Sequence, residues 1–147
     1  MPAVIREITP ETVGDPIRVI REAERPLVAF TGGATYRPII GDDTGAGLPI
    51  RTGIQTSPPG YSTRIHSHPY VETLTVIAGR GEAWLDGEAG VVALEPGITV
   101  VLAANRPHAF RVLGERPLVT LGIHTFGKRI VDYRDACANL PGPPERV

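Results

Sequence analysis

Turn-forming residues recur every few positions in this chain of 147 residues and leave only short runs between them. The sequence contains 17 glycines and 15 prolines, and the intervening runs are rich in Val, Ile, Thr and Leu. Short β-branched runs bounded by such residues are typical of strands joined by tight turns. We therefore predict an all-β protein, with strands over residues 17–22, 27–30, 35–40, 50–56, 63–68, 72–78, 81–86, 91–95, 98–103, 108–113, 118–126 and 129–133.

So many short strands cannot lie in one flat sheet, because its two edges would remain open to other chains. Closure into a barrel or a two-sheet jelly roll is the expected architecture. The length suits a single domain over residues 1–147, with a barrel core over about residues 45–127 and a flexible tail over residues 134–147. Only residues 9–13 and 132–139 look faintly helical.

Composition favours a globular protein that does not bind nucleic acid. Hydrophobic residues make up 41% of the chain, and 15 Lys and Arg nearly balance 16 Asp and Glu, so no basic surface is indicated. The charged N-terminus lacks an apolar signal segment, and no apolar run approaches the roughly 20 residues of a membrane span. We expect a cytoplasmic protein that does not bind membranes. The single cysteine, Cys137, excludes an internal disulfide and is a poor candidate nucleophile.

Three histidines lie on strand faces that are predicted to point into the barrel. Because successive side chains of a strand point to opposite sides, Arg64, His66 and His68 share one face of their strand. His108 begins a second one-sided row that continues with Phe110. A group of imidazoles is thus expected to face an apolar interior.

A carboxylate is predicted to join the same interior. Glu72 shares a strand face with Leu74 and Val76, which should pack in the core. A buried carboxylate is costly unless a cation or strong hydrogen-bond donors compensate it. We therefore expect Glu72 to lie beside a positive charge or a set of donors.

The histidines and the glutamate fall into a regular spacing. Between Gly60 and Gly79 the sequence reads G-x5-H-x-H-x3-E-x6-G, with His66, His68 and Glu72 at the inner positions. This segment resembles the first motif of the cupin superfamily at every fixed position. Five fixed residues coincide by chance in a chain of this composition on the order of once in ten thousand.

A second segment resembles the partner motif of the same superfamily, which reads G-x5-P-x-G-x2-H-x3-N. Gly97 and His108 stand where that motif places them, whereas Ala103, Asn105 and Val112 replace its proline, glycine and asparagine. Asparagine is the commonest residue other than glycine at positive φ, so Asn105 can hold the turn that aims His108. The resemblance covers roughly residues 45 to 127.

The resemblance implies a cupin double-stranded β-helix, or jelly-roll barrel, that binds one metal through His66, His68, Glu72 and His108. Three imidazoles and one carboxylate suit Fe, Mn, Ni, Co, Cu or Zn as divalent ions. Four ligands on an octahedral ion leave two positions for a substrate, O2 or water. The family includes dioxygenases, isomerases, decarboxylases, lyases and cyclases.

We therefore expect a metal-dependent enzyme acting on a small oxygenated metabolite, with dioxygenation the first class to consider. A non-catalytic binding protein or sensor for a sugar or organic acid is the alternative. Fold alone does not choose between them. A pocket shared by Arg64 and the open metal positions would favour ligand binding over a structural site.

Residues around the expected metal divide between functional and packing roles. Arg64, on the face of His66 and His68, is a candidate catalytic residue that could grip an anionic substrate, or else a rim residue. His124 could act as a general base, although a lone histidine on an apolar strand favours a core or surface role.

Aromatic residues and the N-terminal third have simpler interpretations. Tyr61, Tyr70 and Trp84 are expected in the core or at the rim of the barrel, because aromatic residues in strands usually pack. The apolar strands predicted over residues 17–30 exceed what a minimal barrel needs, so they could cover an edge of a second copy. We expect a homodimer that binds a small molecule.

Overall fold

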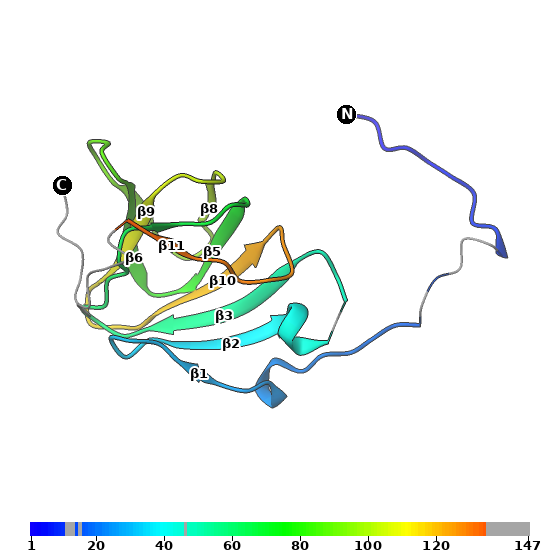
Figure 1. Cartoon of the computed structure of the whole chain (residues 1–147), viewed down its shortest axis with the longest axis horizontal. Helices are drawn as coiled ribbons and strands as arrows, with labels where there is room; N and C mark the ends of the chain where they lie inside the picture. The colour runs from blue at the N-terminus through cyan, green and yellow to red at the C-terminus, as the bar shows by residue number, and fades with distance from the viewer. Residues whose placement is uncertain (11–13, 15, 46, 135–147) are drawn as a thin grey trace.

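Two antiparallel β-sheets form the barrel of the protein (Figure 1). The computed structural model describes residues 1–10, 14, 16–45 and 47–134. Within them, one sheet has six strands in the order β1-β2-β3-β10-β5-β8 and the other has five in the order β11-β4-β9-β6-β7. This arrangement confirms the predicted all-β jelly roll.

The strands are short, as the spacing of the turns predicts. Their bounds are β1 Val28–Ala29, β2 Thr35–Ile40, β3 Arg51–Ser57, β4 His66–Ser67, β5 Glu72–Ala78, β6 Arg80–Leu85, β7 Val92–Leu94, β8 Thr99–Leu102, β9 His108–Leu113, β10 Leu118–His124 and β11 Asp132–Tyr133. Two 3-10 turns, η2 Glu22–Glu24 and η3 Asp42–Thr44, are also described. The predicted strands over residues 35–40, 72–78 and 108–113 coincide with β2, β5 and β9 from end to end.

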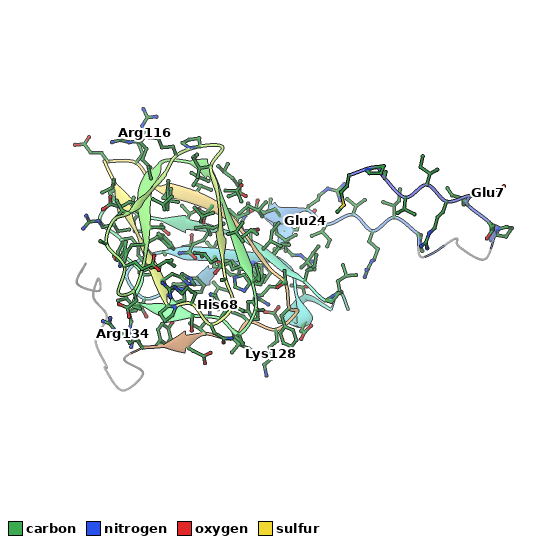
Figure 2. All side chains as sticks on the ribbon, turned by 90° about the horizontal axis from the view of Figure 1, so that it is seen from above. Glu7, Glu24, His68, Arg116, Lys128 and Arg134 are labelled. Carbon is green, nitrogen blue, oxygen red and sulfur yellow. The ribbon has the colours of Figure 1, made fainter. Side chains whose placement is uncertain are left out.

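The strand predicted over residues 17–22 is wrong. Residues 17–21 carry no strand pairing, and Glu22 begins η2 instead. The β-branched residues Ile17 and Val19 are exposed, because this segment runs outward from the barrel and none of the described strands lies beside it (Figures 1 and 2). Sequence alternation alone cannot supply the partner that a strand requires.

Two segments were predicted to be weakly helical, residues 9–13 and residues 132–139. At the start of residues 132–139, Asp132–Tyr133 form β11, which pairs with β4, so the helical prediction is wrong there. Residues 135–139 lie outside the described residues, as do residues 11–13 of the other faint helix. Cys137 and the predicted tail beyond Arg134 also lie outside them.

The core lies between the two sheets and is made of the inward rows of facing strands. Alternation along β5 buries Glu72, Leu74 and Val76, as predicted. The main cluster consists of Leu74, Val76, Ala83, Leu94, Phe110, Val112 and Leu118, with Tyr61 and Val100 packed against it. Trp84 packs in a second, smaller cluster with Ile65 and Ala109, so its predicted core role is confirmed.

Two turns beside strands of the barrel have backbone conformations with positive φ. Gly79, between β5 and β6, has φ of 80°, and a Cβ atom there would lie 2.1 Å from the carbonyl oxygen of Pro117. Asn105, three residues before β9, has φ of 59° and is the one described residue other than glycine with positive φ. The predicted role of Asn105 in the turn before His108 is thus confirmed.

No helix in the described part of the chain is long and apolar enough to span a membrane.

Candidate metal centre

Strand pairing brings five ionisable side chains from four segments to one end of the barrel interior. His66 on β4 pairs with His108 on β9, and Glu72 on β5 pairs with His124 on β10. His68 follows β4 by one residue. His68, Glu72, His108 and His124 are each less than a tenth exposed. The register of the strands therefore brings together five side chains that are spread over 59 positions of the sequence, from His66 to His124.

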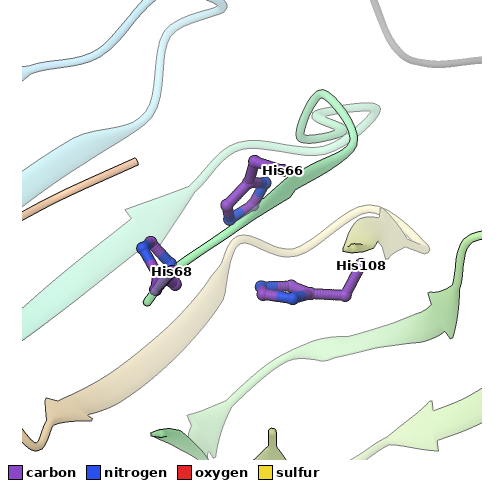
Figure 3. Close-up of side chains that lie close together, drawn as sticks. All are labelled: His66, His68 and His108. Carbon is purple, nitrogen blue, oxygen red and sulfur yellow. The ribbon is translucent and has the colours of Figure 1, made fainter. Parts of the chain in front are cut away.

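The three histidines of the two sequence motifs face one another. Figure 3 shows the rings of His66, His68 and His108 turned toward a common space. The ring centroid of His66 lies 4.5 Å from that of His108 and 5.2 Å from that of His68. Their ligand atoms lie within 4.8 Å of one another, a spacing at which they could hold a metal ion.

Backbone carbonyls fix the orientation of each of these three rings. Nδ1 of His66 lies 2.7 Å from the carbonyl oxygen of Arg64, and Nδ1 of His108 lies 2.8 Å from that of Arg106. Nδ1 of His68 lies 2.5 Å from the carbonyl oxygen of Ile130. A carbonyl only accepts, so each Nδ1 carries the proton and donates it. In the neutral rings, Nε2 then offers a lone pair to the interior, which is the arrangement of a metal-binding histidine.

Glu72 completes this donor set. Its Oε2 atom lies 3.1 Å from Nε2 of His68 and 3.7 Å from Nε2 of His108. Oε2 is buried and has no hydrogen-bond partner among the described residues. An oxygen carrying negative charge that faces nitrogen lone pairs is unfavourable, unless a cation or a proton lies between them. The residues present therefore fit a bound metal cation.

The charges of the cluster are consistent with that fit. Burial alone would raise the pKa of Glu72, but hydrogen-bonding contacts with His108, His124 and His68 outweigh burial and hold that pKa well below the usual range; at His108 and His68 this requires a proton, or a cation in its place, between Nε2 and Oε2. Burial, together with the nearby His108, lowers the pKa of His66 to about 4. At neutral pH the cluster thus offers a carboxylate and a neutral imidazole, the states that bind metals.

His124 also lies in the cluster, although the sequence favoured a core or surface role for it. Its Nε2 atom is 3.2 Å from Oε1 of Glu72, and its Nδ1 atom is 2.9 Å from the hydroxyl oxygen of Tyr70. His68, Glu72 and His124 form a second group that could hold a metal. The inward row of β10, Leu118 and Thr120 followed by His124, was the signal that could have placed it.

A cavity of about 880 Å³ opens onto the cluster. Among the described side chains that line it, Glu72 is the only acidic residue, while Arg64 and Arg129 bring two guanidinium groups. Arg64 stacks over the ring of Tyr133 at 4.3 Å, and Arg129 over that of Phe30 at 5.0 Å. The cavity therefore has a positive, aromatic wall, and sequence reasoning missed the contribution of Arg129.

The segment around Tyr61 is part of this cavity. Tyr61 and its neighbours from Gly60 to Arg64 line it. Tyr61 also packs against Phe110 of the core. Tyr70 is buried behind His124, so it does not line the cavity mouth.

The chain matches the model of a known protein family. The family model described as cupin domain matches residues 53–124, the range that contains all five clustered residues. The chain belongs to the cupin superfamily. No curated protein sequence matches this cupin.

Solved structures share its fold. Oxalate decarboxylase from Bacillus subtilis is 20% identical with a TM-score of 0.69, covering 78% of this chain and 31% of its own. The polyketide cyclase RemF from Streptomyces resistomycificus is 19% identical with a TM-score of 0.68, and the match covers 81% of this chain and 86% of the cyclase. A cupin-like protein from Thermotoga maritima is 22% identical with a TM-score of 0.64, and the match covers 85% of this chain and 92% of that protein. This cupin thus spans about a third of the length of the decarboxylase.

Proposed function

We propose that this cupin binds one divalent transition metal through His66, His68, Glu72 and His108, and that it is a metal-dependent enzyme. The observation that carries the proposal is the buried Oε2 atom of Glu72, which faces imidazole nitrogens and has no hydrogen-bond partner among the described residues. Imidazole and carboxylate ligands suit Fe, Mn, Ni, Co, Cu or Zn, and the ligand types do not select among these metals.

The cavity supports a ligand-binding role over a purely structural metal. Arg64 and the four proposed ligands line the same space of about 880 Å³, which is large enough for a small metabolite. A metal in this position would supply Lewis-acid or redox chemistry to a bound substrate. The chain would bind and orient that substrate, with Arg64 as the cation that holds an anionic group.

Dioxygenation of a small oxygenated metabolite is the reaction we propose to test first. Isomerisation, elimination and cyclisation use the same donor set and remain the alternatives. The similar structures include an oxalate decarboxylase and a polyketide cyclase, so the fold supports more than one reaction. A non-catalytic sensor for a sugar or organic acid is the competing role, since the same cavity would serve it.

Two further parts of the proposal come from the sequence. The protein would act in the cytoplasm, and it would form a homodimer through the apolar residues of its N-terminal segment.

Reconstitution with single metals tests the proposed function. The metal-free protein would be loaded anaerobically with each of the six metals and exposed to panels of small oxygenated metabolites. O2 consumption in step with substrate loss would support a dioxygenase, and isomerised or cleaved products without O2 uptake would support the alternatives. Saturable binding of a metabolite without any turnover would support the sensor and contradict the enzyme.

A further inference from the structure

The two carboxylate oxygens of Glu72 face different partners. Oε2 points to Nε2 of His68 and Nε2 of His108, whereas Oε1 lies 3.2 Å from Nε2 of His124. Both His68 and His108 use Nδ1 on backbone carbonyls. His124 differs, because its Nδ1 atom meets the hydroxyl of Tyr70. A hydroxyl can donate as well as accept, so His124 is the one histidine of the cluster whose tautomer no carbonyl dictates.

The surroundings of Tyr70 decide where its single proton goes. The backbone N–H of Ile130 donates to the hydroxyl oxygen at 3.1 Å. The hydroxyl can donate to the carbonyl oxygen of Ile130, at 3.2 Å, or to Nδ1 of His124, at 2.9 Å. That carbonyl already accepts from Nδ1 of His68 at 2.5 Å. The shorter contact and the occupied carbonyl both favour donation to His124.

Electrostatics favours the same assignment. If Nδ1 of His124 carried the proton of the neutral ring, its Nε2 lone pair would face the Oε1 atom of a carboxylate at 3.2 Å. Two electron-rich atoms at that distance repel each other in a buried site. With the proton on Nε2, the same distance becomes a hydrogen-bonding contact to an ionised acceptor, which is among the stronger kinds.

Resting on the proposed metal site, we propose that His124 is a positioning residue and not a metal ligand. It donates its Nε2 proton to Oε1 of Glu72, and Tyr70 holds it in that tautomer. Glu72 is thereby held with Oε2 alone directed at the metal position, so it would bind the metal through one oxygen. The relay from Ile130 through Tyr70 and His124 supports the carboxylate in the way that outer-shell partners support metal ligands.

Nuclear magnetic resonance of the wild-type protein loaded with zinc tests the tautomers directly. Nitrogen-15 spectra of the histidine side chains should show His124 protonated at Nε2 and unprotonated at Nδ1. His66, His68 and His108 should show the opposite pattern, with a proton on Nδ1 and zinc on Nε2. Zinc on Nε2 of His124, or a proton on its Nδ1 with none on Nε2, would overturn the proposal.

A pair of variants tests the role of the donor. In His124→Gln the side-chain amide can still donate near Oε1, while His124→Phe keeps the ring volume and removes the donor. We expect His124→Phe to weaken zinc binding, measured by chelator competition, by about 10- to 100-fold, and His124→Gln to restore most of it. Tyr70→Phe should leave one zinc per chain but allow both tautomers of His124 in the spectra.

The remaining outcomes separate this inference from the metal site itself. Zinc affinity of His124→Phe equal to that of the wild type, with circular dichroism showing both folded, would contradict a positioning role. Equal losses in His124→Gln and His124→Phe would contradict donation to Glu72 and indicate a ligand. If the wild-type protein binds no metal, the proposed function fails first, and this inference falls with it.

Discussion

The Oε2 atom of Glu72 lies 3.1 Å from Nε2 of His68, yet it has no hydrogen-bond partner among the described residues. The reason lies on the other side of the imidazole, where Nδ1 of His68 lies 2.5 Å from the carbonyl oxygen of Ile130 and donates to it. The proton of the neutral ring is thus turned away from the carboxylate. The two groups are arranged for a third, positively charged species.

The metal-free protein should lose stability in mild acid. The pKa of His66 falls from its ordinary value of 6.5 to about 4 because of burial and the neighbouring His108, and the pKa of Glu72 is also lowered. The folded state then binds fewer protons than the unfolded state, so the free energy of unfolding decreases as the pH falls. His66 alone should account for a loss on the order of 3 kcal/mol between pH 6.5 and pH 4.

Urea unfolding of the metal-free protein between pH 7 and pH 4 measures this loss. The variant His66→Gln serves as the control, because it removes the titrating imidazole and should flatten the curve in this range. A free energy of unfolding that is constant, or that increases on acidification, would contradict the assignment.

Glycine at position 79 should be far less replaceable than glycine at position 97. Both have positive φ, so alanine costs about 1–2 kcal/mol at either position. At Gly79 the new Cβ atom would also lie 2.1 Å from the carbonyl oxygen of Pro117, whereas nothing lies within 4 Å at Gly97. We expect an additional cost of roughly 1–3 kcal/mol for Gly79→Ala. Equal unfolding free energies for the two variants would show that the close approach is unimportant.

The protein should be a homodimer in solution. Ile17 and Val19 are 93% and 72% exposed on a segment that extends from the barrel, and burial against a second copy would remove that apolar surface from water. Light scattering at micromolar concentration should give about twice the chain mass of 15.7 kDa.

A double variant, Ile17→Glu with Val19→Glu, should dissociate the dimer into monomers. Val101→Glu is the matched control, because Val101 is similarly exposed but lies on β8 at an edge of the barrel. A monomeric wild-type protein would refute the prediction.

Arg64 should matter for substrate and not for metal. Its guanidinium group lines the cavity and stacks over Tyr133, where a planar fork can bind an anion through two hydrogen bonds. Once a substrate is known, Arg64→Lys should lower kcat/KM by roughly 10-fold or more, with unchanged metal content. Arg129→Lys is the matched comparison at the second cation of the cavity. Unchanged kinetics in Arg64→Ala would make Arg64 a rim residue.

Local patterns predicted the parts of the fold that depend on neighbouring residues in the sequence. The inward row of Glu72, Leu74 and Val76 follows from the two-residue period of a strand, and the turn at Asn105 follows from backbone sterics. The spacing of His66 and His68 likewise placed both imidazoles on one face. These features need no knowledge of the partner strands.

Features that depend on distant pairing could not be predicted in the same way. His124 meets Glu72 only because β10 pairs with β5 in one particular register. The role of Ile130, whose carbonyl holds His68, depends on how the chain passes behind the site after β10. The strand expected over residues 17–22 failed for the opposite reason, because none of the described strands pairs with it.

Metal content measures the central claim most directly. Elemental analysis of the wild-type protein, loaded with zinc or cobalt and then dialysed, should give one metal per chain. His108→Ala should lose most of that metal while circular dichroism still shows a folded β protein, because one ligand disappears and the apolar core stays intact. Thr120→Val, which alters another buried residue lining the cavity, should keep it. Stoichiometric metal in His108→Ala, or none in the wild type, would contradict the four-ligand site.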